Sequence, residues 1–276
     1  MNRPTTCANL TKAIRVARPG EDTVRLARAM GGVVVGQMLP DGVIKGGSSL
    51  LFRYGAGNVR YTRDMDTART LSLDAYVTAL ERALAAGWNG FTGRLATVAP
   101  PSPPGVPRAY VMMPFDIKLA YNRRPWQTLR IEVGHDEIGD ADRAETVLPG
   151  ELAELFERLG FPRPRPLPVM PLAHQVAQKL HALSAPDSER AHDLVDLQLI
   201  ARHSPLDLAE VRDICIRLFA YRRAQSWPPS ISKGRGWDDL YAAAGAGLPV
   251  EPDADRAIAW TQGFIREIDG ARASDK

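Results

Sequence analysis

Apolar residues recur every three to four positions in several stretches of the chain, a pattern typical of amphipathic helices. This spacing predicts an early helix over about 21–38 and a second helix between Ser72 and Gly87. Ser72 stands where an N-cap is expected, and Gly87 stands where a helix is expected to end. The first part of the chain therefore contains at least two helices.

Runs rich in β-branched and aromatic residues lie between and after these helices. VRYTRDMD at 59–66 is interpreted as a strand, and so are RAYVMMPFDIKLAY at 108–121 and TLRIEVGHDE at 128–137. We expect the last two runs to be neighbouring strands of one sheet. The sheet would thus continue past the proline-rich stretch at 100–107.

A second proline cluster at 162–171 separates this region from one in which only helical periodicity is found. The helices predicted after it cover about 171–184, 190–202, 206–222, 236–246 and 253–269. The order of elements favours an α+β fold, with an α/β core and a mixed sheet followed by a C-terminal helical domain. We expect a core domain over 1–160 and a helical domain over 161–276 that carries part of the site.

Composition excludes several classes of protein. The chain has 276 residues, of which 45% are hydrophobic and 24% charged, values close to the average for a globular protein. Its net charge of +3 is too small for a general polyanion binder. The two cysteines cannot form a disulfide framework. With no signal peptide and no run of 18 apolar residues, we expect a cytoplasmic protein without a membrane span.

Two carboxylates, Asp64 and Asp66, stand at the end of the run 59–66, with one residue between them. In a strand, residues i and i+2 point to the same face, so both carboxylates would project together. Paired carboxylate oxygens suit Mg²⁺, which often also binds substrate phosphates. The alternative interpretation is two solvated surface acids.

The glycine pair Gly46–Gly47, followed by Ser48 and Ser49, precedes these carboxylates. Glycine lets the backbone approach a phosphate closely, and a hydroxyl can donate to a phosphate oxygen. An ordinary glycine turn before a helix is the alternative. The pattern differs from the GxxxxGK[ST] motif, which disfavours a P-loop NTPase.

A glycine–serine turn followed by a strand with two carboxylates resembles the DNA polymerase β-like nucleotidyltransferases. The chain is more closely similar to their AbiEii/AbiGii toxin group, which includes the MenT-type toxins. The resemblance rests on KGGSSL at 45–50, on RxTxDxD at 60–66, and on Lys179 followed by RxxDLxDL at 190–197. It covers about 45–66 and 171–200. One departure is the 15-residue spacing between Ser48 and Asp64, which we interpret as a longer loop.

The resemblance implies roles for further residues. Gly46, Gly47, Ser48, Arg60, Lys179 and Arg190 would bind the nucleotide, and Lys179 would neutralise the triphosphate. Asp193 and Asp196 become active-site residues that hold Lys179, an arginine or the nucleotide. Ordinary ion pairs on a helix surface are the alternative for these side chains.

A polymerase-type site usually needs a third carboxylate on the adjacent strand, to share metal ions and accept a proton. Glu132 is the first candidate and Asp116 the second. Thr62 lies two residues before Asp64, so in a strand it would share the face of the metal pair. Phosphorylation there would place negative charge beside two carboxylates, and we hypothesise that it silences the enzyme. The alternative is that Thr62 simply packs or forms a hydrogen bond in the strand.

The function implied is a toxin of a toxin–antitoxin system that transfers a nucleoside monophosphate from an NTP to the 3′ end of tRNA, with two Mg²⁺ ions held by Asp64 and Asp66. Such a modification would block translation, and a cognate antitoxin is the expected partner. Two alternatives remain: transfer to a small molecule or a protein, and a catalytically silent module that binds a nucleotide or a partner.

Overall fold

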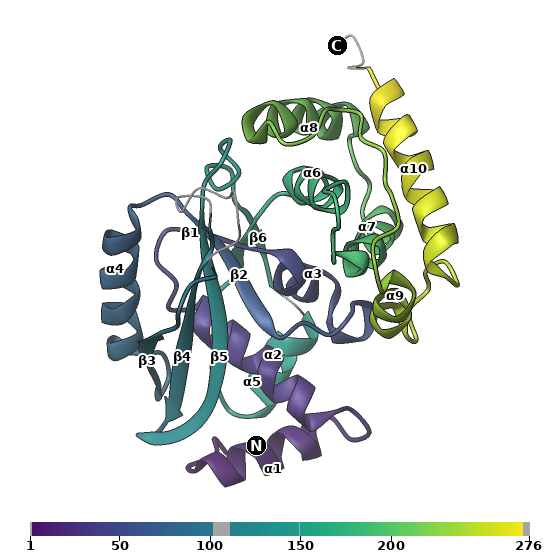
Figure 1. The fold of residues 1–276 in the computed structure, drawn as a ribbon. Helices are drawn as coiled ribbons and strands as arrows, with labels where there is room; N and C mark the ends of the chain where they lie inside the picture. The colour runs from purple at the N-terminus through teal and green to yellow at the C-terminus, as the bar shows by residue number, and fades with distance from the viewer. Residues whose placement is uncertain (1, 102–110, 149, 273–276) are drawn as a thin grey trace. The chain divides into compact units, whose positions relative to one another are not determined.

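The computed structural model of the protein describes residues 2–101, 111–148 and 150–272 (Figure 1). The chain forms two compact units. The first comprises Met1–Gly57, Tyr61–Asp136 and Ala141–Met170, and the second comprises Asn58–Arg60, Glu137–Asp140 and Pro171–Lys276. The division at Met170 differs from the domain boundary expected at 160, because a short strand at 167–169 pairs in the sheet. The separate roles expected of the two domains stay a prediction.

The first unit contains a mixed sheet of seven strands, counted over the described residues, in the order β3-β4-β5-β2-β1-β7-β6. The pairs β2·β5 and β1·β7 are parallel, and the remaining pairs are antiparallel. The expected mixed sheet is thereby confirmed. The strands are β1 (Gly42–Lys45), β2 (Asp64–Arg69), β3 (Phe91–Thr97), β4 (Met113–Tyr121), β5 (Arg124–His135), β6 (Glu145–Val147) and β7 (Leu167–Val169).

Two of the predicted strands are confirmed as neighbours, since β4 and β5 pair along their length. The beginning of the run 108–121, and most of the proline cluster before it, lie outside the described residues. The third prediction, a strand over 59–66, is wrong in its bounds. β2 begins at Asp64, and the residues 58–60 belong to the second unit.

The described residues of the first unit also form helices, which lie beside the sheet. They are α1 (Cys7–Ala17), α2 (Thr23–Gly36), α3 (Gly46–Tyr54), α4 (Leu73–Ala86) and α5 (Gly150–Arg158), with a short 3-10 helix at Ala56–Asn58. The predicted cap of α4 is present, since Ser72 accepts a hydrogen bond from the N–H of Ala75. Buried residues of α1, α2, α4 and α5 pack with Met65 and Ile131 of the sheet.

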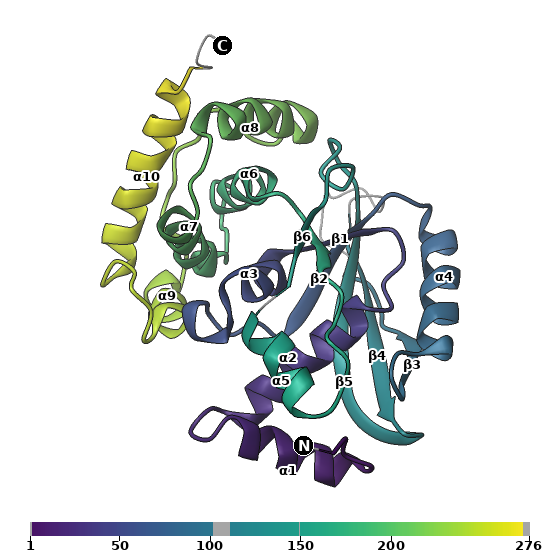
Figure 2. The same ribbon diagram turned by 180° about the vertical axis from the view of Figure 1, so that it is seen from behind.

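The second unit is helical, as predicted, and Figures 1 and 2 show its helices as a group without strands. Its helices are α6 (Leu172–Leu183), α7 (Ala191–His203), α8 (Leu208–Arg222), α9 (Trp237–Gly245) and α10 (Ala254–Gly270). All five follow the expected ranges closely. α7 contacts α6, α9 and α10, and every residue from Asp193 to Ile200 is buried.

Among the described helices, none combines the length and the apolar character that crossing a membrane would require.

Candidate active site

Asp64 and Asp66 are the first and third residues of β2, with buried Met65 between them. Met65 belongs to the main core, so the two carboxylates lie on the opposite face of the sheet. Asp64 is exposed and Asp66 is half-buried. The predicted pair therefore shares one face, although it stands at the beginning of the strand instead of its end.

The start of α3 lies against Asp66. Gly46 has a φ of +64°, and a Cβ at this position would overlap Oδ2 of Asp66. Only glycine combines this backbone conformation with such a close approach. The N-cap residue Lys45 makes no side-chain hydrogen bond to the helix. The first N–H groups of a helix have no partners inside it and favour negative charge nearby, which suits the expected role of Gly46 and Gly47.

Ser48 is tied to the same strand through its hydroxyl. Its Oγ donates a hydrogen bond of 2.9 Å to the carbonyl oxygen of Asp64, and the residue is buried. A serine hydroxyl has one hydrogen, so in this arrangement the side chain of Ser48 can only accept further hydrogen bonds. The hydroxyl fixes α3 to β2, and the backbone N–H is the group through which Ser48 would contact a phosphate.

Glu132 lies directly beside Asp66, because the two residues are register partners in the parallel pair of β2 and β5. Register partners in adjacent strands point to the same face, so Glu132 joins Asp64 and Asp66. Asp116 is one strand further away on β4, where its Oδ1 accepts a 2.7 Å hydrogen bond from Nε of Arg130. Register therefore favours Glu132 over Asp116 as the third carboxylate.

Two basic residues of this face were missing from the residues predicted for the site. Lys45 is the register partner of Asp66 on β1, and its Nζ lies 3.3 Å from where a Cβ on Gly134 would be. Arg130 is the register partner of Asp64 on β5. Arg130 could have been predicted from the sequence, because it lies two residues before Glu132 and residues i and i+2 of a strand share a face. Lys45 could have been predicted because it directly precedes the glycine pair Gly46–Gly47.

The second unit brings together five residues that the sequence singled out. Nζ of Lys179 lies 2.6 Å from Oδ1 of Asp193 and 2.6 Å from Oδ2 of Asp196. Arg60 donates two hydrogen bonds of 2.9 Å, one to each carboxylate oxygen of Asp196. Nε of Arg190 donates one of 2.9 Å to Oδ2 of Asp193. We call Arg60, Lys179, Arg190, Asp193 and Asp196 the buried charge cluster.

The cluster holds its carboxylates in the charged form. Burial by itself would raise the pKa of Asp193, but Lys179 and Arg190 outweigh burial and leave that pKa below its usual value. The pKa of Asp196 is likewise lowered, because Lys179 and Arg60 outweigh its burial. Three cations surround two carboxylates, so the cluster carries one net positive charge. A buried carboxylate is tolerated only with such complete pairing.

Lys179 is 5% exposed and already contacts two carboxylates, which differs from the lysine expected to reach a triphosphate as a free charge. The guanidinium of Arg60 likewise already forms hydrogen bonds to Asp196. Arg190 differs from both, because its side chain is 51% exposed while it contacts Asp193. It is the cation of the cluster best able to meet a ligand.

Thr62 lies before β2 and not within it, so strand alternation does not place its side chain on the face of Asp64. Its Oγ1 donates a 3.3 Å hydrogen bond to the carbonyl oxygen of Asp64, which still places the side chain next to the carboxylate pair in the chain. A regulatory phosphorylation at Thr62 stays a prediction.

No group of three or more His, Cys, Asp or Glu side chains in the described ranges has the arrangement of a ready metal site. The donor chemistry nevertheless fits Mg²⁺, because Asp64, Asp66 and Glu132 offer carboxylate oxygens on a single face. Mg²⁺ commonly takes only one or two protein carboxylates and completes its shell with water and substrate phosphates. These residues are therefore suited to a site that forms with the nucleotide.

Comparison with known proteins gives a family match over most of the chain. Residues 34–264 match the family model described as "Nucleotidyl transferase AbiEii toxin, Type IV TA system". No curated protein is similar enough in sequence to count as a match.

Solved structures add a likeness of fold. The MenT4 nucleotidyltransferase toxin of Mycobacterium tuberculosis H37Rv superposes with a TM-score of 0.55 at 19% identity, covering 96% of this chain and 97% of that one. JHP933 from Helicobacter pylori gives a TM-score of 0.46 at 15% identity, over 89% and 91% of the two chains.

Proposed function

Because the chain belongs to the AbiEii family of nucleotidyltransferase toxins, we propose that it transfers a nucleoside monophosphate from an NTP to the 3′ end of tRNA, with release of pyrophosphate. The observation that carries this proposal is the shared face of Asp64, Asp66 and Glu132 beside the N-terminus of α3. Carboxylates for a metal and N–H groups for phosphates stand next to each other there.

Mg²⁺ is the proposed cofactor, and Asp64 and Asp66 are the residues that would hold it, with two ions expected at the site. When bound, such ions supply charge that stabilises both the attacking and the leaving oxygen of an in-line displacement. The chain contributes the carboxylates at a fixed spacing, which the pairing of β2 with β1 and β5 maintains.

Glu132 is the proposed proton acceptor for the reacting hydroxyl. The oxygen of the acceptor hydroxyl would attack the α-phosphorus of the NTP, and the bond from that phosphorus to the bridging oxygen would break. Pyrophosphate would leave, and the proton of the hydroxyl would pass to the Glu132 carboxylate. The N–H groups of Gly46, Gly47 and Ser48 would bind the phosphates, and Lys45 would lower the negative charge near Asp66.

For the buried charge cluster we propose a role in nucleotide binding through its exposed cation, Arg190. Lys179, Asp193 and Asp196 are then positioning residues, since they hold the arginines in place. Arg60 connects the cluster to the carboxylate pair along the chain. Only three residues separate it from Asp64 in the sequence.

The partners of this reaction follow from the family. A toxin of a toxin–antitoxin system is encoded with an antitoxin, and we propose a cognate antitoxin as the protein partner. Nucleotides added to the 3′ end of tRNA would stop aminoacylation and hence translation. Because the proposed acceptor is a cytoplasmic RNA, the enzyme would act in the cytoplasm.

The test is incubation of the purified protein with Mg²⁺, total tRNA and each NTP in turn, labelled at the α-phosphate. Label in tRNA that is lost when the 3′ end is first oxidised with periodate supports the proposal, since periodate destroys the terminal diol. Label in tRNA that survives periodate would place the addition elsewhere. Label in a small molecule or a protein supports the second candidate, and no transfer of any label supports a silent binding module.

A further inference from the structure

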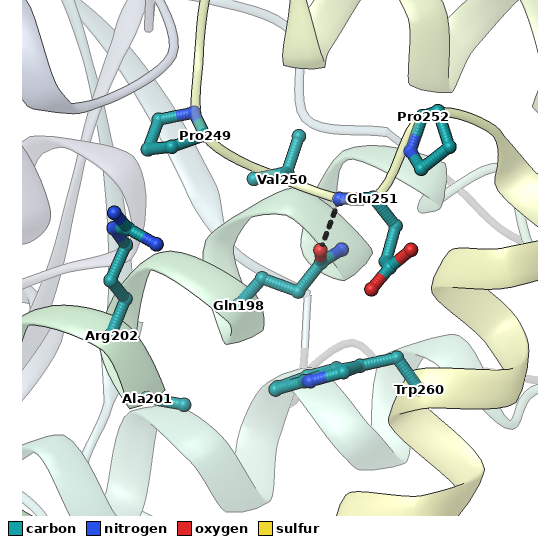
Figure 3. Close-up of a pocket in the computed structure, with 8 residues that line it drawn as sticks. All are labelled: Gln198, Ala201, Arg202, Pro249, Val250, Glu251, Pro252 and Trp260. Atoms are coloured by element: carbon teal, nitrogen blue, oxygen red, sulfur yellow. Dashed lines mark hydrogen bonds between the residues drawn. The ribbon is translucent and has the colours of Figure 1, made fainter.

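A pocket of about 450 Å³ opens in the second unit, and none of its residues belongs to the proposed catalytic set (Figure 3). Gln198 and Arg202 reach it from α7, and Trp260 reaches it from α10. The segment from Pro249 to Pro252 forms the side opposite Trp260 in Figure 3. The volume is in the range of pockets that hold a small ligand.

Hydrogen bonds fix the wall opposite Trp260. Oε1 of Gln198 accepts a 2.7 Å hydrogen bond from the N–H of Glu251, and Nε2 of Gln198 donates to Oη of Tyr241. The hydroxyl of Tyr241 in turn donates to the carbonyl oxygen of Glu251 at 2.7 Å. Nε2 of Gln198 also donates to the carbonyl oxygen of Leu194. The pocket is thus formed in advance, and both hydrogens of the Gln198 amide are already used.

Trp260 supplies a flat aromatic surface. Its indole stacks on the ring of Phe264, with centroids 5.2 Å apart and an angle of 27° between the planes. Phe264 therefore supports the indole, and Figure 3 shows the ring of Trp260 lying along the floor of the pocket. A supported indole is a platform on which another planar ring can stack.

The pocket carries opposite charges at its two ends. Figure 3 shows the Arg202 guanidinium at one end and the Glu251 carboxylate toward the other, above the ring of Trp260. Within the part of the chain that the structure describes, neither group makes a hydrogen bond or an ion pair. A matching ligand is planar, carries hydrogen-bond donors at one end and is anionic at the other. A free amino acid fits poorly, because its ammonium and carboxylate sit on one carbon.

We propose that this pocket binds a guanine nucleotide. The base stacks on Trp260, its N1–H and 2-amino groups donate to the two oxygens of Glu251, and its phosphate accepts from Arg202. Guanine is the base with two adjacent N–H donors on one edge, which matches the paired oxygens of a carboxylate. Arginine suits a phosphate because its guanidinium presents several donors in one plane.

The same chemistry has two sources, a free guanine nucleotide and an unpaired guanosine within an RNA strand. In the second case the pocket would contribute to recognition of the proposed RNA acceptor, and this part of the inference rests on the proposed function. Binding is measured without any transfer reaction, so the pocket and the catalytic proposal can fail separately.

The experiment measures binding of 5′-GMP, 5′-AMP, 5′-CMP, 5′-UMP and guanosine to the full chain by calorimetry or ligand-observed NMR, with EDTA present. GMP should bind best. Trp260→Ala should weaken GMP binding roughly tenfold or more, as expected for loss of base stacking, and Trp260→Phe should retain most of it. Glu251→Gln should remove the preference for GMP over AMP. Arg202→Ala should weaken GMP but leave guanosine unchanged.

Arg256→Ala is the matched control, because Arg256 is an exposed arginine of α10 that does not line the pocket. Circular dichroism checks that each variant is folded. The oligomers UUGUUU and UUUUUU separate the two sources. Tighter binding of the first than of GMP indicates RNA, and equal or weaker binding indicates the free nucleotide.

Three results would overturn the inference. The first is the absence of GMP binding to the wild-type protein, and the second is GMP binding that Trp260→Ala leaves unchanged. The third is binding of N-acetyl-arginine amide that depends on Glu251 while GMP binding does not. That third result would make the pocket a site for a basic side chain of a protein, held by Trp260 and Glu251.

Discussion

Arg60 donates a hydrogen bond of 2.9 Å to each carboxylate oxygen of Asp196, although 135 residues lie between them in the chain. Residues 58–60 belong to the helical unit, and this bidentate pair holds them there. The pair also explains why β2 begins at Asp64 and not at the predicted residue 59. Val59, Tyr61 and Thr62 favour a strand, but the ion pair of Arg60 overrides that local preference.

The first prediction concerns the carboxylate pair. Asp64→Asn and Asp66→Asn should each lower nucleotide transfer by about a hundredfold or more, because each removes a negatively charged oxygen from the proposed Mg²⁺ site. The fold should be retained, since asparagine keeps the shape of the side chain. The α-phosphate label assay measures transfer. Asp74→Asn, in the first turn of α4, is the control, and wild-type rates in both site variants would refute the assignment.

The second prediction separates the two candidates for the third carboxylate. Glu132→Gln should lower transfer by about 10²- to 10⁴-fold, the usual cost of losing a proton acceptor. Asp116→Asn should change transfer little, because Asp116 lies one strand further from Asp66 and pairs with Arg130. Rates measured across pH 6 to 9 check both variants. The reverse order of effects would give the role to Asp116.

The third prediction concerns stability. Lys179→Met should lower the free energy of unfolding by about 3–5 kcal/mol, because it leaves two buried carboxylates short of a cation. Lys179→Arg should restore little, since a wide guanidinium does not fit the site of a compact ammonium. Urea unfolding measures the change.

A double variant tests the reason for that loss. Lys179→Met combined with Asp193→Asn should recover part of the stability, because one uncompensated charge is removed with its partner. If Lys179→Met unfolds like the wild type and loses only NTP binding, the lysine is a phosphate ligand after all.

The fourth prediction concerns pH. Burial lowers the pKa of His192 from 6.5 to about 4, and burial together with Arg222 lowers that of His181 to about 4. Between pH 6.5 and 4 the unfolded chain therefore binds protons at these two residues while the folded chain does not. The free energy of unfolding should fall as pH is lowered through this range.

Urea unfolding at several pH values checks this slope. His192→Gln and His181→Gln should each make it shallower, and His203→Gln, at an exposed position, serves as the control. An unchanged slope in both site variants would contradict the expected pH dependence.

The fifth prediction concerns Thr62. Thr62→Glu should lower transfer strongly, because it adds a negative charge beside Asp64, while Thr62→Val should stay within a few-fold of wild type. The hydrogen bond from Thr62 to the carbonyl oxygen of Asp64 is absent in both variants, so it does not confound the comparison. Equal activity in the two variants would argue against silencing by charge.

Local patterns in the sequence were sufficient for most of the helices. Ser72 and Asp207 accept hydrogen bonds from the first turns of α4 and α8, and the apolar spacing behind them is regular. The missed helix α1 carried the same signals, since Thr6 caps it and Leu10 and Ile14 are buried on one side. It went unrecognised because few large apolar residues occur along its short length, between polar and basic ones.

The candidate site was predictable only in part. Residue types and spacing singled out Asp64 and Asp66, and the resemblance to a known family singled out the residues around Lys179. Which third carboxylate stands beside Asp66 depends on strand register, and the burial of Lys179 depends on contacts between α6 and α7. Both are long-range properties that a local pattern does not contain. The pocket at Trp260 depends likewise on the path of the chain before α10.

The helical unit is discontinuous in sequence, and this has a consequence for its folding and dissection. Two short segments from earlier in the chain, 58–60 and 137–140, belong to this unit. The first is held by the hydrogen bond from Arg60 to Asp196, and the second by the hydrogen bond from Arg222 to Glu137. A fragment beginning at Pro171 would lack both and would leave the Asp196 carboxylate without its arginine. During synthesis the unit can be completed only after α7 and α8 emerge, since pairings of high sequence separation form late. Cutting the chain at one point should therefore yield no stable copy of the helical half.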